Sequence, residues 1–231
     1  MTTLVPKQIE CAVCGEQSEQ TVVGSSSSFG APDLDGRPPA LLRYTISYWV
    51  QRCPSCGYCA PRIAEPSVKA TEVMGEVLYQ TQLHNHRFPV VANSFLCAAF
   101  IQEQQEQLAD AGWSCVYAAW VCDDERNTSA AQQCRRKAIA LLQQATDAGE
   151  QIYEDPEQAA LLLTDLMRRA GEFAAAAVHC QQMLAQSLSP LVQHILTAQQ
   201  ALITRRDMAG YTVEEAIGES TYRSLSEQRK K

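Results

Sequence analysis

The pattern of hydrophobic and polar positions changes about a quarter of the way along the chain. Before that point, residues 41–50 (LLRYTISYWV) are rich in β-branched and aromatic side chains, which predicts a strand that runs directly into Cys53. Residues 21–23 (TVV) are a candidate for a short partner strand. The intervening residues 25–39 (SSSSFGAPDLDGRPP) are rich in Ser, Gly, Pro and Asp and predict a loop. We therefore expect residues 1–66 to form a small module of strands and loops.

Helix-forming residues dominate after this module. Ser67 is a candidate N-cap behind Pro66, and apolar residues follow it at the spacing of one buried helix face. These apolar residues are Val73, Met74, Val77 and Leu78. Short polar breaks separate the longer segments that follow, which is typical of stacked antiparallel helices. Helices are expected at about 90–108, 110–123, 128–146, 156–169, 173–187 and 190–204.

Part of this helical region has a repeat-like sequence. Residues 161–177 (LLLTDLMRRAGEFAAAA) resemble the middle of a tetratricopeptide unit, with a Gly-acidic-aromatic turn that begins at Gly171. However, the small residues of two such segments, Ala131 and Ala176, lie farther apart than the roughly 34 residues of that repeat. The consensus Trp and Pro positions are also missing. We therefore expect degenerate, tetratricopeptide-like helix hairpins rather than a regular array.

Composition and charge narrow the class of protein. With 46% hydrophobic and 19% charged residues, the chain has the composition of a globular protein. Its formal net charge of −7 disfavours nucleic acid as a partner, because affinity for phosphate backbones comes from clustered Lys and Arg. We find no run of about 18 uncharged apolar residues and no secretory signal pattern, so we expect no membrane span and a cytoplasmic protein.

The ten cysteines fall into two groups. One group is clustered among Pro and Gly in the first quarter of the chain. The other group is scattered singly through Ala- and Leu-rich sequence and is expected to pack as small hydrophobic residues. The scattered cysteines are Cys97, Cys115, Cys122, Cys134 and Cys180. In a reducing compartment, clustered cysteines bind metal or take part in chemistry more often than they form disulfides.

Two C-x-x-C-G motifs are the strongest chemical signal in the chain. They are CAVCG, which contains Cys11 and Cys14, and CPSCG, which contains Cys53 and Cys56. Two intervening residues let both sulfurs of a motif face one ion, and the glycine permits a tight turn. The 38 residues between Cys14 and Cys53 exceed the usual spacing of about 15–20, and the flexible loop accounts for the excess at little entropic cost. The pattern predicts one structural Zn²⁺ in a zinc-ribbon-like module.

Other interpretations of the second motif remain open. A redox pair would begin a helix in a βαβ context, whereas this motif follows a predicted strand and is duplicated upstream. The triple Cys53, Cys56 and Cys59 has the spacing of iron–sulfur ligands, but the fourth ligand and its following Pro are absent. Cys59 is either a small residue packed beneath the ribbon or a fifth thiolate that takes part in metal exchange.

Further candidate residues are less specific. His84 and His86 are possible additional ligands, but they would point to opposite sides of an extended segment, and a capping or turn role is expected. The acids of CDDERN (122–127) have the pattern of a solvated turn at a helix end. The nucleotide-binding, hydrolase-elbow and metalloprotease motifs are absent, so we expect a protein that is not an enzyme.

The chain resembles a bacterial family catalogued as domain of unknown function 2225. The resemblance covers most of residues 8–205. It rests on ECAVCG, YWVQRCPSCGYCAP, FLCAA, YAAWVCDDE, CRRKAIALL and LLLTDLMRRAGEF. It implies a zinc-ribbon module followed by tetratricopeptide-like helices, and it supplies neither a substrate nor a role for Cys59.

Together these patterns predict an α+β, mostly α protein with three parts. They are a zinc-ribbon-like module (1–66), a helical tetratricopeptide-like domain (67–218) and a frayed tail (219–231). The expected function is a non-catalytic scaffold whose helices present a groove to a protein or peptide. Two alternatives stay open: a nucleic-acid-binding zinc ribbon, and a small-molecule enzyme or sensor with a pocket between ribbon and helices. The candidates to line that pocket are Tyr58, Cys59, His84, His86 and Trp120.

Overall fold

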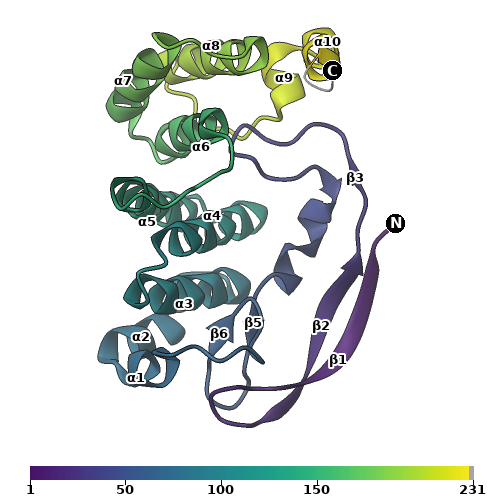
Figure 1. Ribbon diagram of the computed structural model, residues 1–231, viewed down its shortest axis with the longest axis vertical. Coiled ribbons are helices and arrows are strands. Elements are labelled where there is room, and N and C mark those ends of the chain that lie inside the picture. The colour runs from purple at the N-terminus through teal and green to yellow at the C-terminus, as the bar shows by residue number, and fades with distance from the viewer. Residues whose placement is uncertain (229–231) are drawn as a thin grey trace. The chain divides into compact units, whose positions relative to one another are not determined.

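The computed structural model describes residues 1–228, and its fold is α+β and mostly α, as predicted (Figure 1). About 56% of the chain is helical. The chain forms two compact units. The first contains Met1–Ser28 and Leu41–Glu150, and the second contains Phe29–Ala40 and the chain from Gln151 onward. The boundary predicted at residue 66, between a zinc-ribbon-like module and a helical domain, falls inside the first unit. It stays a prediction.

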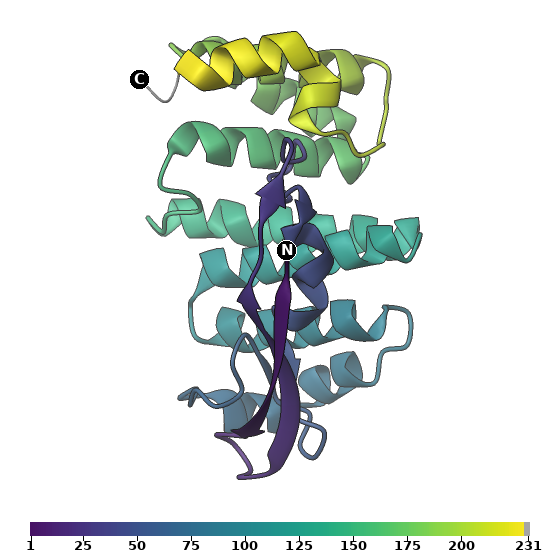
Figure 2. The same cartoon turned by 90° about the vertical axis from the view of Figure 1, so that its right-hand side faces the viewer.

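Two small antiparallel hairpins carry the clustered cysteines of the first unit. Strands β1 (Thr3–Glu10) and β2 (Gln17–Ser25) form a long two-stranded ribbon, seen clearly in Figure 2. Strands β5 (Gln51–Arg52) and β6 (Cys59–Ala60) form a much shorter pair. Strand β2 contains the strand predicted at 21–23, but its partner is β1 and not the segment 41–50. A third pair joins β3 (Ser28–Phe29) to β4 (Ala40–Leu41), where the chain passes between the two units.

The helices of the first unit lie close to where the hydrophobic pattern predicts them. They are α1 (Ala70–Gly75), α2 (Val77–Leu83), α3 (Val90–Gln104), α4 (Leu108–Asp124) and α5 (Thr128–Asp147). However, the single buried face predicted from Val73 to Leu78 is wrong in its second half. Val73 and Met74 are buried, whereas Val77 and Leu78 are 80% and 65% exposed, because the helix breaks at the extended residue Glu76.

Asn127 caps α5 by accepting a hydrogen bond from the Ala130 amide at 3.2 Å. Gly112 lets α4 and α5 approach closely, because a Cβ at that position would lie 2.5 Å from Cδ2 of Leu142.

The strand predicted at 41–50 is wrong for most of its length. Residues Leu42–Tyr48 form a 3-10 helix, η1. The Thr45 hydroxyl donates to the Leu42 carbonyl and accepts from Nε1 of Trp49, each at 2.7 Å. The Trp49 ring then meets Tyr117 of α4 edge-on, with ring centroids 5.3 Å apart. The ring contact comes from a distant helix, and together with the local hydrogen bonds it overrides the β propensity of the segment.

The second unit contains the remaining helices (Figure 2). They are α6 (Pro156–Arg169), α7 (Phe173–Leu184), α8 (Pro190–Thr204), α9 (Val213–Ile217) and α10 (Glu219–Gln228). Asp155 caps α6 by accepting from the Glu157 amide at 3.0 Å, and Pro156 occupies the first turn. Helix α10 forms where the sequence predicts a frayed tail, and residues 229–231 of that predicted tail lie outside the described chain.

The loop predicted at 25–39 is largely an ordered part of the second unit. We call its segment Phe29–Ala40 the strap. The strap pairs with the chain before α9: the Leu34 amide donates to the Tyr211 carbonyl at 2.9 Å, and the Val213 amide donates to the Pro32 carbonyl at 2.8 Å. No helix within residues 1–228 is long and apolar enough to cross a membrane.

Candidate metal centre

The two cysteine motifs adopt the same backbone geometry at the ends of the two hairpins. In the first turn, the Gly15 amide donates to the Cys11 carbonyl at 2.8 Å. In the second, the Gly57 amide donates to the Cys53 carbonyl at 3.0 Å. The two glycines have φ angles of 75° and 77°, a left-handed conformation that favours glycine over residues with a side chain. The repeated C-x-x-C-G sequence therefore encodes a repeated tight turn.

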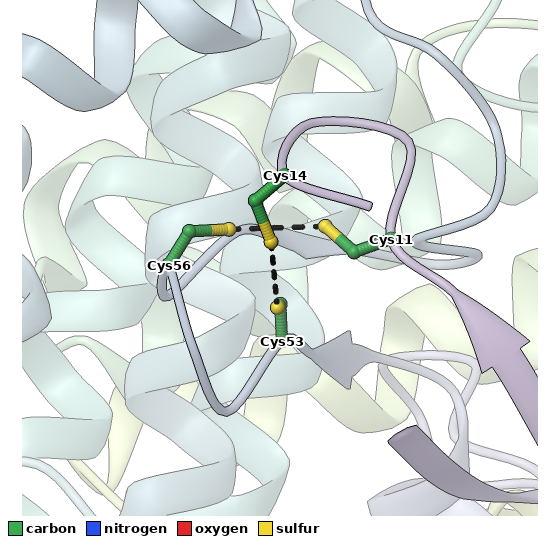
Figure 3. A group of neighbouring side chains, drawn as sticks. All are labelled: Cys11, Cys14, Cys53 and Cys56. Atoms are coloured by element: carbon green, nitrogen blue, oxygen red, sulfur yellow. Dashed lines mark hydrogen bonds between the residues drawn. The ribbon is translucent and has the colours of Figure 1, made fainter. Parts of the chain in front are cut away.

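The four sulfur atoms of these motifs converge (Figure 3). The Cys11 and Cys56 sulfurs lie 3.7 Å apart, and those of Cys14 and Cys53 lie 3.6 Å apart. All four sulfurs lie within 4.8 Å of one another. Zinc–thiolate bonds of about 2.3 Å in a tetrahedron place sulfurs roughly 3.8 Å apart, whereas disulfide sulfurs lie about 2.05 Å apart. The spacing fits four ligands of one ion and not two disulfides.

The thiol groups of this cluster have opposing pKa shifts. A hydrogen bond from the Glu16 amide is the main cause that lowers the pKa of Cys14 to about 7. Burial raises the pKa of Cys11, although the amides of Cys14 and Val13 oppose it, and burial also raises the pKa of Cys56. Four thiolates this close repel one another, and a bound dication offsets that repulsion while it deprotonates the thiols.

The exposure of the cluster is uneven. Cys11 and Cys53 are buried, Cys56 is half-buried and Cys14 is exposed. An ion can therefore reach the sulfurs from the side of Cys14. Four thiolates complete a tetrahedral zinc site and leave no position for water or substrate, which is the arrangement of structural rather than catalytic zinc.

A buried segment between the motifs and the helices ties the two turns together. The Ala12 amide, within the first motif, donates to the Ile63 carbonyl at 2.8 Å. The Ile63 amide in turn donates to Oε1 of Gln51 in β5, at 2.9 Å. Ile63 and Gln51 are 0% and 4% exposed. Our sequence analysis missed both residues, since their only signal is a position next to the second motif.

Cys59 lies outside the cluster of four. It is buried in β6, and its sulfur donates to the Gly57 carbonyl at 3.4 Å. A hydrogen bond with Cys97 of α3 is the largest cause that lowers the pKa of Cys59, and the same bond raises the pKa of Cys97. The third cysteine of the second motif therefore faces a helix rather than the other sulfurs.

The two candidate histidines also lie outside the cluster. His84 is the C-cap residue of α2, and its Nδ1 lies 2.8 Å from the Gln80 carbonyl. His86 is exposed and lines a shallow concavity that also contains Glu125. Within residues 1–228, the four cysteines are the only group of three or more metal-ligating side chains whose ligand atoms all lie within 4.8 Å of one another.

The structure does not bring the other candidate pocket residues into one cavity. Tyr58 and Cys59 line a cavity of about 340 Å³, and His86 lines a different one. Trp120 is buried against Tyr117, with ring centroids 5.3 Å apart. Of the acids in CDDERN, Asp123 is not merely part of a solvated turn, because it forms an ion pair with the buried Arg135 of α5.

Comparisons with known proteins identify a family and no characterised relative. No curated protein and no solved structure matches the chain. The model of a bacterial family, described as "Uncharacterized protein conserved in bacteria (DUF2225)", matches residues 4–203. Since this match spans most of the chain, including both cysteine motifs, the protein belongs to that family.

Proposed function

We propose that Cys11, Cys14, Cys53 and Cys56 bind one structural Zn²⁺ and thereby fold a zinc-ribbon-like module. The convergence of their four sulfurs carries this proposal. The ion is needed because the β1–β2 ribbon buries little: none of its residues is fully buried. Small modules that bury too little apolar surface depend on such metal cross-links.

The donor set favours zinc over other metals. Four thiolates in a tetrahedron suit Zn²⁺ or iron, and they disfavour Mg²⁺ and Ca²⁺, which take oxygen ligands. Zinc has no redox chemistry and no geometric preference of its own, so it fits a site whose role is to hold two hairpins together.

We further propose that the protein is a non-catalytic scaffold that binds a protein or peptide through its helices. Each unit supplies antiparallel, tetratricopeptide-like helix hairpins, and such stacks present extended binding surfaces. Large apolar side chains are exposed near the start of the helical part: Val77 and Leu78 of α2 are 80% and 65% exposed, and Val90 of α3 is 72% exposed. The net charge of −7 disfavours nucleic acid as that partner.

The zinc proposal is tested by metal analysis of the purified protein and of Cys53→Ser. We expect about one zinc per chain in the parent and a large loss in the variant. The variant's tryptophan fluorescence should also melt at lower temperature, because Trp49, Trp113 and Trp120 all lie in the first unit. Cys115→Ala is the matched control, since Cys115 is fully buried in that unit but lies outside the cluster. Full zinc occupancy and unchanged melting in Cys53→Ser would refute the site, and iron would be recognised by its visible absorption.

The scaffold proposal is tested by capture of partners on immobilised protein. The double variant Val77→Asp, Leu78→Asp should lose a partner that the parent retains, because it places charge on the exposed face of α2. Val178→Asp is the control, since Val178 is also exposed (55%) but belongs to α7 in the second unit. Equal capture by both variants would contradict a role for the α2 surface.

A further inference from the structure

The second unit contains a cavity of about 420 Å³ that the proposed functions leave unexplained. It is lined by the strap, by α6, α8, α9 and α10, and by Tyr153 in the connection before α6, and it opens to solvent on one side. All of its lining residues belong to the second unit, so the cavity is independent of the cysteine cluster.

The deep part of the cavity is apolar, and its outer part is polar. Leu162 of α6 and Ile195 of α8 are buried, with 1% and 3% exposure. Gln158, Tyr222 and Ser226 are partly exposed and lie where a ligand would meet solvent. An apolar interior with a few polar groups is the usual composition of small-molecule sites, and the volume lies within their typical range of about 300–1,000 Å³.

The wall formed by the strap is already fixed in place. The strap turns tightly: the Asp33 amide donates to the Arg37 carbonyl, and the Gly36 amide donates to the Asp33 carbonyl, both at 2.9 Å. Gly36 has a φ of +79°, and a side chain there would collide with the Tyr153 hydroxyl. The glycine therefore lets the strap backbone pass directly against Tyr153. A ligand would find this side of the cavity preformed, which lowers the entropic cost of binding.

The charge of the lining restricts the ligand. Among the described lining residues, Asp33 is acidic and none is Lys, Arg or His. A carboxylate or phosphate would lose its hydration without gaining a cationic partner, which is costly in an apolar site. Tyr153 and Tyr222 contribute aromatic rings to the lining, which suits an aromatic ligand, and the nearby amide and hydroxyl groups can form hydrogen bonds with a polar end.

We propose that this cavity is a binding site for an uncharged, largely apolar small molecule that contains an aromatic ring and one hydrogen-bonding group. This binding site lies entirely in the second unit and is independent of zinc and of a protein partner.

Two probes with the same ring test the proposal on the full-length protein: 2-naphthylmethanol, which is neutral, and 2-naphthoate, which is anionic. Binding is measured by isothermal titration calorimetry and by saturation-transfer NMR. We expect saturable one-to-one binding of the alcohol and at least about tenfold weaker binding of the carboxylate.

Substitutions of lining residues test whether the alcohol binds in this cavity. Leu191→Trp and Gln158→Trp fill the cavity from two different helices at partly exposed positions, so each should weaken binding of the alcohol by at least about tenfold. Val178→Trp adds the same ring to an exposed position outside the cavity and should leave affinity unchanged. Circular dichroism melting verifies that each variant folds, and two blocking variants guard against the failure of one.

Three results would overturn the proposal. These are no saturable binding of the alcohol to the folded parent, equal binding of alcohol and carboxylate, and alcohol binding that survives in both blocking variants. None of these results bears on zinc content or on partner capture, so this proposal and the proposed function fail separately.

Discussion

Arg169 donates a hydrogen bond from Nη1 to Oδ2 of Asp35 at 2.9 Å, although 134 positions separate the two residues. The Asp35 side chain is 0% exposed and that of Arg169 is 10% exposed. This ion pair fixes the strap to α6, and Arg168 beside it binds Asp165 and the carbonyls of Asp207 and Ala209. Two consecutive arginines of α6 therefore hold two non-helical segments of the second unit, the strap and the connection between α8 and α9.

Replacement of Asp35 by Asn should destabilise the second unit selectively. The change leaves the charge of Arg169 buried without its carboxylate partner, and such losses cost about 3 kcal/mol in the free energy of unfolding. Circular dichroism in urea should show the loss, while tryptophan fluorescence should not, because every tryptophan lies in the first unit. Glu154→Gln removes an exposed charge from the same unit and should change stability by less than about 0.5 kcal/mol. A uniform shift of both signals in Asp35→Asn would contradict local anchoring.

In the first unit, Asp123→Asn should lower the stability that tryptophan fluorescence reports. Asp123 accepts from two nitrogens of Arg135, whose side chain is 2% exposed. Loss of the carboxylate should lower the unfolding free energy by about 3 kcal/mol as read by tryptophan fluorescence. The neighbouring Glu125→Gln, at an exposed position, is the control. Equal effects of the two changes would show that the pair contributes little.

Protonation of His179 should make the second unit less stable in mild acid. Burial lowers the pKa of His179, whose Nδ1 lies 2.9 Å from the Thr164 hydroxyl oxygen. The unfolded chain, with a histidine pKa of about 6.5, then takes up the proton first as pH falls. Stability is thus full above about pH 6.5 and declines as pH falls through the lower folded-state pKa.

The measurement is the melting temperature by circular dichroism at several pH values. His179→Gln should flatten the decline that begins below about pH 6.5, since it removes the titrating ring. His194→Gln replaces an exposed histidine of α8 and should leave the decline as it is in the parent. If both variants retain the full decline, another group is responsible.

The fate of zinc in Cys59→Ala separates the two interpretations of this residue. Because Cys59 contacts Cys97 and Gly57 rather than the four sulfurs, the variant should keep about one zinc per chain and lose only about 1 kcal/mol of stability. Rates of zinc transfer to a chelator should match those of the parent. Markedly slower transfer would instead indicate that Cys59 assists metal exchange as a fifth thiolate.

Much of this molecule was predictable because its signals are local. The start of α5 follows from Asn127 as cap, and Pro156 and Pro190 mark the first turns of α6 and α8. The cysteine cluster was predictable for a different reason. Its two halves repeat the same short motif, so the sequence itself indicates that they belong together, although Cys14 and Cys53 are 39 positions apart.

The features that escaped prediction depend on partners with no sequence signal. The segment before Cys53 has β propensity, but it forms a 3-10 helix in which the Trp49 ring packs edge-on against Tyr117 of α4. The strap has the composition of a free loop, but Asp35 forms an ion pair with Arg169, which lies 134 positions later in the sequence. The cavity of the second unit depends on that docking as well, so the sequence alone could not reveal it.

The position of the strap also affects how the protein is made. A ribosome delivers Phe29–Ala40 early, yet helix α6, which holds it, begins only at Pro156. At translation speeds of about 5–20 residues per second, the interval is on the order of ten seconds. The first unit is complete at Glu150, ahead of Arg169 and Tyr211, whose contacts hold the strap, so it can begin to fold before those contacts form. Both ends of the strap are joined to the first unit, which is synthesised before the residues that the strap contacts. The strap can therefore dock only after those later residues have been made.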